Sequence, residues 1–349
     1  MPEGHTIYRQ AREHNRTLRG QVVRADSPQG RFAAGAALID GRTLLRAEAV
    51  GKHLFHQYDS QNWLHVHLGL YGEWRTGTPP LPSPRGALRL RLWTENVWWE
   101  LRGATACEVL TRPEVTVIRN RLGPDPLRRN ADPDRAYARI GRSRAPIAAL
   151  LMDQSVLAGV GNVYRAELLF RHGIDPHRPG HDITPEQWSQ MWADLLILMR
   201  DGVRRGRIVT TRPPHRRRSR VYVYRRTGEP CLVCGTPVRT EILLARNLFW
   251  CPVCQLRLVT EPDSVREHTT GADWTESGGS LRAKVNAEAK PGDLALIHRD
   301  DKGVAAGSGE RVAVDVQGER QQLGIPWRQL RRPADLKGQL EVRGPAGVA

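Results

Sequence analysis

Residues 231–254 read CLVCGTPVRTEILLARNLFWCPVC and contain four of the five cysteines in the chain. They form two Cys-x-x-Cys pairs, which supply four thiolates in the arrangement of a structural zinc site. The predicted zinc ligands are Cys231, Cys234, Cys251 and Cys254. Four protein ligands leave no open coordination position, so we expect one structural zinc ion here rather than a catalytic one. The metal would stabilise a β-hairpin that is too small to fold by itself.

The chain around this hairpin is strongly basic. It has 349 residues, a net charge of +16 and a pI of about 10.4. Residues 271–349 hold 12 Lys and Arg against 11 Asp and Glu, so nearly all of the excess positive charge lies in the first 270 residues. This balance, with aromatic residues between the arginines, favours nucleic acid over a membrane surface as the partner. The sequence lacks a signal peptide and any apolar run near the ~18 residues of a membrane span, so we expect a soluble cytoplasmic protein.

The segment before the hairpin, Arg204–Arg226, concentrates this charge. Within it, Val221–Tyr224 alternates valine with tyrosine, which predicts a strand. Its loop arginines are Arg216, Arg217, Arg218 and Arg220. They are either a solvated run of charge or a nucleic-acid contact, and the charge of the whole chain favours contact. Arg246, near the predicted hairpin tip, is a further arginine that could enter a groove of DNA.

Two helices joined by a glycine-rich turn are predicted further back along the chain. Ile147–Asp153 is the first, Gly159–Asn162 is the turn, and Val163–His172 is the second. The glycines allow close backbone approach, and a helix N-terminus behind them presents free N–H groups suited to a phosphate. Asn162 adds a side-chain donor. The spacing fits an ordinary pair of helices with no ligand equally well.

Thr184-Pro185-Glu186-Gln187 predicts the start of a longer helix, with Thr184 as the N-cap and Gln187 completing a capping box. Its apolar stripe of Trp and Met residues recurs at helical spacing and predicts core packing. Residues 119–145 are rich in Arg, Pro, Asp and Gly, and we interpret them as a linker.

The first 118 residues predict a mostly β domain behind one N-terminal helix over residues 1–20. Short strand-like runs, separated by Gly, Pro, Asp and Asn, favour a β-sandwich or barrel. The predicted strands are Gln21–Ala25, Thr43–Val50, His53–Tyr58, Trp63–Leu68, Ala87–Leu92, Val97–Leu101 and Ala106–Leu110.

The chain begins with MPEG. If the initiator methionine is removed, Pro2 becomes the N-terminus and its nitrogen is a free secondary amine. An α-amino group has a pKa of about 7.7–8.0, so roughly a tenth of it is unprotonated at pH 7, far more than for lysine. That favours Pro2 as a nucleophile that attacks a sugar carbon and forms a Schiff base. Glu3 is the candidate proton shuttle. Taken alone, MPEG is also an ordinary chain start.

Two further features of this domain are candidates. Lys52 follows Gly51 in a turn between two predicted strands, where it could reach a phosphate, although a lysine in a turn is usually only solvated. Leu70 and Tyr71 follow Gly69 at a strand end. Apolar side chains at a turn can wedge into a base stack, although core packing is the commoner outcome.

Together, MPEG, the lysine turn, the segment QSVLAGVGNVYRAELLF and the four-cysteine hairpin resemble the formamidopyrimidine-DNA glycosylase/endonuclease VIII family. The resemblance covers roughly residues 2–260, with all four motifs in the family's order. It implies an α+β protein: a β-sandwich with a leading helix, a helix-two-turn-helix domain and a zinc-finger β-hairpin.

The resemblance also implies roles for individual residues. Pro2 would attack C1′ of a damaged nucleotide beside Glu3, and Lys52 would assist by contacting phosphate. Asn162 and Arg246 match the family's phosphate-binding asparagine and zinc-finger arginine. Leu70 and Tyr71 fall where the endonuclease VIII branch has its void-filling residues, with Gly69 in place of a more polar residue.

The implied activity is a bifunctional DNA glycosylase/AP lyase of base excision repair that removes oxidised bases and cuts the strand by β,δ-elimination. GLYGEWR, with MPEG, resembles the endonuclease VIII branch and favours oxidised pyrimidines; preference for oxidised purines is the alternative. The partner would be damaged double-stranded DNA, bound by a monomer at the bacterial nucleoid. One departure is His5-Thr6, where the family usually has Pro-Glu, so a second carboxylate is missing. A zinc-ribbon protein that senses lesions without cutting is the non-enzymatic alternative.

The character of the sequence changes after about residue 268. We expect a linker and then a small β-rich extension with strands at Leu294–Arg299, Arg311–Val316 and Leu340–Arg343, of unknown function. The predicted domain boundaries are 1–118 for the sandwich, 119–145 for the linker, 146–226 for the helical domain, 227–260 for the hairpin, 261–280 for a second linker and 281–349 for the extension.

Overall fold

The computed structural model describes residues 2–211 and 219–255, together with five short strands further along the chain. The chain divides into two compact units, Met1–Val259 and Thr260–Ala349. Arg216, Arg217 and Arg218 lie outside the described residues, whereas Arg220 is described and exposed. Among the described residues, no helix combines the length and the apolarity that crossing a bilayer requires.

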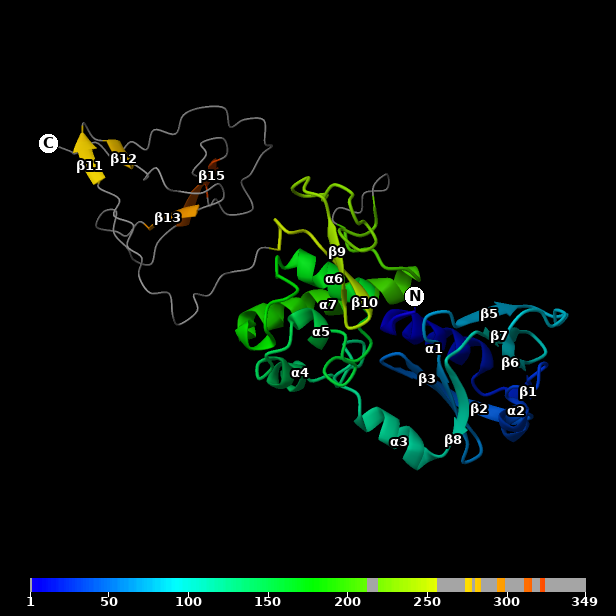
Figure 1. Ribbon diagram of the computed structural model, residues 1–349. Helices are drawn as coiled ribbons and strands as arrows, with labels where there is room; N and C mark the ends of the chain where they lie inside the picture. The colour runs from blue at the N-terminus through cyan, green and yellow to red at the C-terminus, as the bar shows by residue number, and fades with distance from the viewer. Residues whose placement is uncertain are drawn as a thin grey trace. The chain divides into compact units, whose positions relative to one another are not determined.

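Eight antiparallel strands form the N-terminal domain, in the order β5-β7-β6-β1-β2-β3-β4-β8 (Figure 1). Their bounds are β1 Val22–Asp26, β2 Arg42–Val50, β3 His53–Tyr58, β4 Trp63–His67, β5 Glu73–Gly77, β6 Leu88–Trp93, β7 Trp98–Arg102 and β8 Ala106–Leu110. On a flat sheet β5 and β3 would be five strand spacings apart, about 24 Å. The rings of Trp74 and His56 from these two strands are only 6.4 Å apart. The two halves of the sheet therefore face each other as a sandwich, as the sequence predicts.

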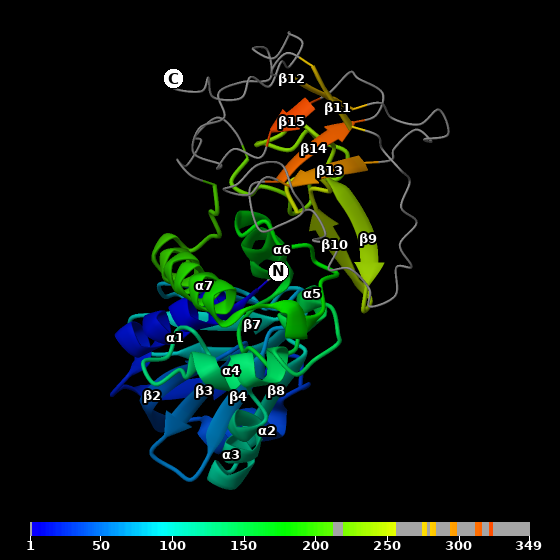
Figure 2. The same cartoon turned by 90° about the vertical axis from the view of Figure 1, so that its left-hand side faces the viewer.

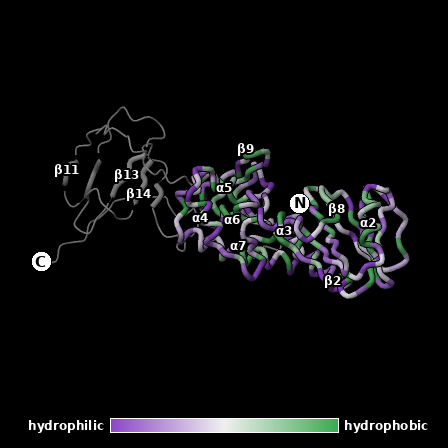
Figure 3. Tube along the Cα trace, turned by 90° about the horizontal axis from the view of Figure 1, so that it is seen from below, coloured by the Kyte–Doolittle hydropathy of each residue, from purple (hydrophilic) through white to green (hydrophobic). Residues whose placement is uncertain are grey.

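Two helices complete this domain: α1 Gly4–Leu18 and α2 Ala33–Ile39. The buried side of α1 includes Ile7, Ala11 and Leu18, which join the core between the two halves of the sheet, and His14, whose ring contacts those of Trp74 and Trp99. Figure 3 shows hydrophobic and hydrophilic residues interleaved along the first unit, as expected where each element has one buried side.

Helices dominate the second half of the first unit. They are α3 Arg112–Asn120, α4 Pro133–Ile140, α5 Ile147–Leu150, α6 Asn162–Arg171 and α7 Pro185–Arg205, with a 3-10 turn at Gly180–Asp182. The predicted capping box of Thr184 and Gln187 begins α7. The predicted linker over 119–145 is not a plain linker, because α4 forms inside it and Ala136 and Ile140 are fully buried in the helical core.

The hairpin of β9 Arg239–Leu243 and β10 Arg246–Trp250 packs against α6. Its two turn residues, Leu244 and Ala245, both have positive φ, as in a type I′ turn. Because such turns usually contain glycine or asparagine, the pairing of the two strands and not the turn residues sets this tight connection. The strand predicted at Val221–Tyr224 is wrong. The backbone N–H groups of Tyr222, Val223 and Tyr224 instead all donate to the carboxylate of Glu167, which a strand ladder would not permit.

The second unit contains a hairpin, β11 Trp274–Ser277 with β12 Ser280–Ala283, inside the predicted second linker. A three-stranded antiparallel sheet follows, with β14 Arg311–Asp315 between β13 Leu294–His298 and β15 Gln321–Leu323 (Figure 2). Two of the strands predicted in the extension are therefore present. The third, Leu340–Arg343, lies outside the described residues.

Candidate active site

Glu3 attaches the N-terminus of the chain to the helical half of the unit. Its side chain is fully buried, and Oε1 accepts a hydrogen bond from the N–H of Val163 at 2.8 Å. Oε2 accepts from the N–H groups of Gly161 at 2.9 Å and Tyr164 at 3.4 Å. These donors belong to the first turn of α6, which has no backbone acceptors of its own for them. Pro2, partly buried, is thereby held beside the N-terminus of α6.

The charge state of Glu3 is set by opposing effects. Burial raises the pKa of this carboxyl above its usual value, while the charge of Lys52 and the three N–H groups act in the opposite direction. A carboxyl with a raised pKa beside fixed donors is suited to take up and release a proton during a reaction.

Three glycines let the N-terminus, the lysine turn and the turn before α6 meet. The N–H of Gly4 donates to the carbonyl of Gly159 at 2.8 Å. A Cβ on Gly159 would lie 3.5 Å from the Cα atoms of both Gly4 and Gly51, and a Cβ on Gly4 only 2.9 Å from the Cα of Gly159. Such close backbone contact requires residues without side chains. The glycines therefore bring Pro2 and Lys52 to the same end of α6.

Lys52 is held by the turn that precedes it. The N–H of Gly51 donates to the buried carboxylate of Asp125 at 2.7 Å. Burial lowers the pKa of Lys52, with the charge of Glu3 opposing this effect and that of Arg246 adding to it. The Lys52 ammonium therefore interacts electrostatically with both the Glu3 carboxylate and the Arg246 guanidinium.

Two histidines that the sequence reasoning missed lie beside Lys52. His53 and His67 are directly opposite each other on β3 and β4, and their rings are 4.9 Å apart. The charge of Lys52 contributes to lowering the pKa of both, after burial and the neighbouring histidines. The available signal was the alternation of His65 with His67 along one strand, which places both on one face of the sheet.

The predicted phosphate-binding residues Asn162 and Arg246 are brought together by the hairpin. Asn162 donates through its amide to the carbonyl of Asn247 at 2.9 Å. Arg165, which is fully buried, donates to the same carbonyl at 3.0 Å and also to the side-chain oxygen of Asn162. Arg246 follows the hairpin turn and is exposed. The hairpin tip is thus fixed to the first turn of α6, a link that the sequence did not predict.

Leu70 and Tyr71 lie in the connection between β4 and β5, which continues from His67. Their exposed fractions are 42% and 86%, so neither is a core residue. Gly69 before them has a φ of +67°, and a Cβ there would lie 1.9 Å from the Oγ1 atom of Thr105. The backbone at this position therefore favours glycine, because a side chain there would be strained and would displace Thr105.

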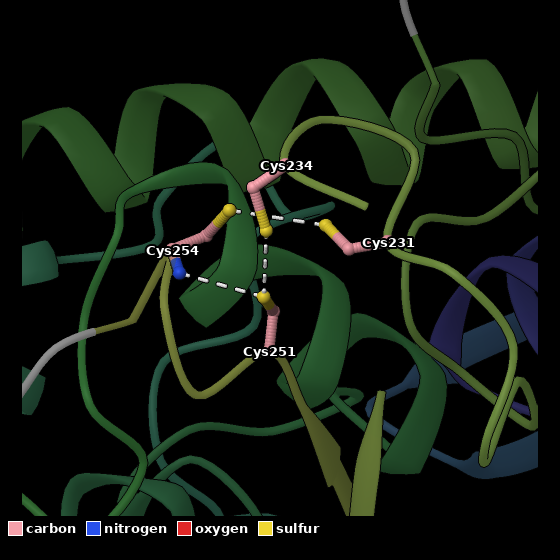
Figure 4. Close-up of side chains that lie close together, drawn as sticks. All are labelled: Cys231, Cys234, Cys251 and Cys254. Atoms are coloured by element: carbon pink, nitrogen blue, oxygen red, sulfur yellow. Dashed lines mark hydrogen bonds between the residues drawn. The ribbon is translucent and has the colours of Figure 1, made fainter. Parts of the chain in front are cut away.

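The four predicted zinc ligands meet at the base of the hairpin (Figure 4). All four sulfur atoms lie within 4.8 Å of one another. Cys231 and Cys254 have their sulfurs 3.8 Å apart, and Cys234 and Cys251 have theirs 3.4 Å apart. A tetrahedron with Zn–S bonds of about 2.3 Å has sulfurs about 3.8 Å apart, so this set fits one structural zinc ion. Bound there, the ion would hold the two ends of the hairpin together.

Comparison with known protein families gives three matches along the chain. The model of the formamidopyrimidine-DNA glycosylase N-terminal domain matches residues 1–105. The H2TH domain model of the same glycosylase matches residues 122–213, and the model of the zinc finger found in FPG and IleRS matches residues 228–257.

Individual relatives agree with these matches. "Endonuclease 8 1" of Mycobacterium tuberculosis is 54% identical over 267 residues, which is 73% of this chain and all of the relative. "Formamidopyrimidine-DNA glycosylase" of Thermus thermophilus is 32% identical over 270 residues, covering 73% of this chain and 97% of the relative. Among solved structures, Lactococcus lactis Fpg in complex with an N7-benzyl-Fapy-dG DNA superposes with a TM-score of 0.64 at 20% identity. That match covers 73% of this chain and 100% of the Fpg chain, and it supports the fold.

Proposed function

Because this chain belongs to the formamidopyrimidine-DNA glycosylase/endonuclease VIII family, we propose that it is a bifunctional DNA glycosylase and AP lyase of base excision repair. The observation that carries the proposal is the attachment of Glu3 to the first turn of α6. This attachment holds the Pro2 amine at the meeting point of the lysine turn, α6 and the hairpin.

The reaction begins at the Pro2 nitrogen once Met1 has been removed. An α-amino group is unprotonated in roughly one molecule in ten at pH 7, which makes it a usable nucleophile. The nitrogen bonds to C1′ of the damaged nucleotide and the glycosidic bond to the base breaks. Glu3 transfers the proton that opens the sugar ring, leaving a Schiff base between Pro2 and C1′. The cationic nitrogen then accepts the electron pair left at C2′ when its proton is removed, and the 3′ phosphate departs. Removal of a second proton, from C4′, then expels the 5′ phosphate.

The remaining predicted residues hold the DNA. Lys52 and Arg246 supply positive charge for backbone phosphates, and Asn162 supplies an amide donor. Leu70 and Tyr71 are exposed and apolar, as is suitable for filling the gap left when the damaged nucleotide is flipped out of the helix. We place the enzyme as a monomer at the bacterial nucleoid, with damaged double-stranded DNA as its partner.

We propose oxidised pyrimidines as the preferred bases. The support is the likeness of MPEG and GLYGEWR to the endonuclease VIII branch, and a relative named Endonuclease 8 1 at 54% identity. Preference for oxidised purines is the alternative, because a relative named formamidopyrimidine-DNA glycosylase is also 32% identical. Single-turnover rates on a panel of duplexes, each with one oxidised pyrimidine or purine, separate the two.

Borohydride trapping tests the nucleophile. Reduction during the reaction on duplex DNA containing an abasic site should link the protein covalently to the DNA, and peptide mapping should place the sugar on Pro2. A protein with one extra residue retained before Pro2 should give no adduct, while Lys52→Ala, which leaves the amine free, should give less. An adduct on another residue, or normal trapping by the extended protein, would remove Pro2 from the mechanism.

The non-enzymatic alternative predicts a different result in the same assay. A zinc-ribbon protein that only senses lesions would bind duplex DNA with an abasic site and leave the strand intact. Cleavage at the abasic site, lost in the extended protein, therefore favours the enzyme.

A further inference from the structure

A chain of hydrogen bonds runs through the β-sheet behind Lys52. Oε1 of Glu108, on β8, is 2.8 Å from Nδ1 of His65, on β4. Nε2 of His65 is 2.9 Å from Nδ1 of His53, on β3. His65 is almost fully buried, whereas about half of the Glu108 side chain is exposed. The chain therefore connects the residue that follows Lys52 with a half-exposed carboxylate on β8.

The chemistry of the three groups fixes where the protons lie. An ionised carboxylate only accepts hydrogen bonds, so Nδ1 of His65 donates to Glu108. When His65 is neutral, its Nε2 then accepts, and the donor to it is Nδ1–H of His53. Nε2 of a neutral His53 is consequently left with a free lone pair. The arrangement has one place for an additional proton, at Nε2 of His53.

Without DNA, the surroundings disfavour that proton. Burial is the largest of the effects that lower the pKa of His53 to about 3. Electrostatic repulsion from His65, His67, Arg121 and Lys52 acts in the same direction. The same cations face the other two rings: Arg121 opposes a charge on His65, and Lys52 opposes one on His67. Glu108 is the acidic group that acts in the opposite direction, on His65. All three histidines are therefore neutral near pH 7 in the free protein.

We propose that the Glu108–His65–His53 chain couples DNA binding to the uptake of one proton, an inference that rests on the proposed contact of Lys52 with a DNA phosphate. A phosphate bound to Lys52 neutralises the positive charge that opposes a proton on His53 and His67. One proton from solvent then bonds to Nε2 of His53, and the resulting N–H faces the phosphate. No other bond breaks: both Nδ1 protons stay in place, His65 remains neutral, and the Glu108 carboxylate balances the charge on His53 through the His65 ring. These histidines act on binding through a phosphate and take no part in breaking the glycosidic bond.

Calorimetry measures this uptake directly. The full-length zinc-loaded protein is titrated with a duplex that carries an uncleavable abasic-site analogue, at one pH in PIPES and in imidazole buffer. Proton uptake makes the binding enthalpy differ between the buffers in proportion to their ionisation enthalpies. We expect uptake of up to one proton per complex, increasing as the pH is lowered, and a Kd that rises by up to about tenfold for each unit increase in pH while the uptake lasts. Equal enthalpies in both buffers together with a pH-independent Kd would overturn the inference.

Two variants assign the effect to the chain. His65→Phe keeps a ring against Phe55 but removes the acceptor for His53. Glu108→Gln removes the negative charge at an exposed position, where the substitution should not impair folding. Both should reduce the uptake and flatten the pH dependence of Kd. The matched control is His181→Gln, because His181 also faces a carboxylate, that of Asp182, but is exposed and outside this cluster. It should leave the uptake unchanged.

The outcomes keep this inference apart from the proposed function. Wild-type protein that binds and cuts abasic DNA without proton uptake refutes the chain as a coupling device and leaves the glycosylase intact. Uptake that persists in both chain variants assigns it to other groups and also refutes the inference. Protein that neither binds nor cuts the DNA refutes the proposed function and this inference with it.

Discussion

Glu3 and Glu167 are two buried carboxylates with the same kind of surroundings. Each is fully buried and accepts hydrogen bonds from three backbone N–H groups. Glu3 binds the start of α6 from the N-terminal domain, whereas Glu167 lies inside α6 and binds residues 222–224. Only Glu3 is adjacent to the proposed nucleophile. The pair therefore separates the structural contribution of a buried carboxylate from a catalytic one.

Glu3→Gln and Glu167→Gln should destabilise the protein to a similar extent. Each glutamine retains one acceptor oxygen and turns an NH2 group toward backbone donors, which leaves a buried N–H unpaired at a cost of roughly 1–3 kcal/mol in the free energy of unfolding. Chemical denaturation measures that loss. Only Glu3→Gln should also abolish the borohydride adduct with abasic DNA. Equal loss of the adduct in Glu167→Gln would show that the role of Glu3 is structural alone.

The residues of the site were only partly predictable from the sequence. Pro2, Lys52, Asn162 and Arg246 occur in local motifs, and the structure places all four around the first turn of α6. The binding of Glu3 to that turn was not predictable, because its partners are 158 to 161 residues away and are backbone groups of any sequence. Buried Arg165 was missed for a related reason, since arginine in a helix is normally solvated.

At the scale of the elements, the glycine contact between the domains can be tested with a matched pair. Gly51 and Gly20 both have positive φ, +59° and +76°, so alanine strains the backbone at each. A Cβ on Gly51 would also lie 3.1 Å from Ala158 Cβ, whereas a Cβ on Gly20 meets nothing within 4 Å. Gly51→Ala should therefore lower Tm more than Gly20→Ala and slow abasic-site cleavage, which Gly20→Ala should not. Equal changes in Tm would mean that the domains separate easily.

The hairpin should depend on its metal. Elemental analysis of the purified protein should give one zinc ion per chain, bound by the four thiolates at its base. Removing the ion with a chelator should free β9 and β10 and release the carbonyl of Asn247 from Asn162 and Arg165. We expect loss of DNA affinity, measured by fluorescence anisotropy, and its recovery when zinc is returned. Unchanged affinity in metal-free protein would contradict this role of the hairpin.

The elements that the sequence predicted wrongly have identifiable causes. Residues 132–134 read Asp-Pro-Asp, and Asp132 caps α4 by accepting from the N–H of Asp134. The same composition also suits a turn, so the helix was interpreted as part of a linker. Val221–Tyr224 alternates as a strand does, but a buried carboxylate 55 or more residues earlier takes its N–H groups. Such tertiary partners are invisible to local patterns.

At the scale of the whole molecule, buried neutral histidines should make the protein sensitive to acid. Burial lowers the pKa of His5 to about 4 and those of His53 and His56 to about 3, and it lowers that of His14 as well. Below about pH 6.5 the unfolded chain binds these protons and the folded chain does not, so stability falls as pH falls. Each histidine adds up to about 1.4 kcal/mol per pH unit to the slope.

One pair of these histidines offers a direct test. Nδ1 of His14 and Nε2 of His56 are 2.8 Å apart inside the sandwich, and the other nitrogen of each ring has no hydrogen-bond partner. Replacing both by leucine should leave stability at pH 7 equal or higher and reduce the acid slope, measured by denaturation at several pH values. The control is His177→Ala, a partly exposed histidine, which should retain the wild-type slope. A wild-type slope in the double variant would assign the acid sensitivity elsewhere.

The overall plan of the molecule was more predictable than its details. The charge excess before residue 271 agrees with the family matches, which extend from residue 1 to residue 257. Motif order and spacing were sufficient to predict a sandwich, a helical part and a metal-bound hairpin, because each depends on local patterns. The angle between the parts depends on the meeting of Gly4, Gly51 and Gly159, which no local pattern specifies.

The attachment of Glu3 to α6 also has a consequence for the order of synthesis. A ribosome makes the proposed nucleophile first, but its anchor is 158 residues further along the chain and the metal-bound hairpin is later still. Methionine aminopeptidase can therefore trim a nascent N-terminus that is not yet enclosed, and the exposed amine remains unpositioned while translation continues. The amine would therefore be free early in synthesis but would be positioned only after the polypeptide that confines it has been made.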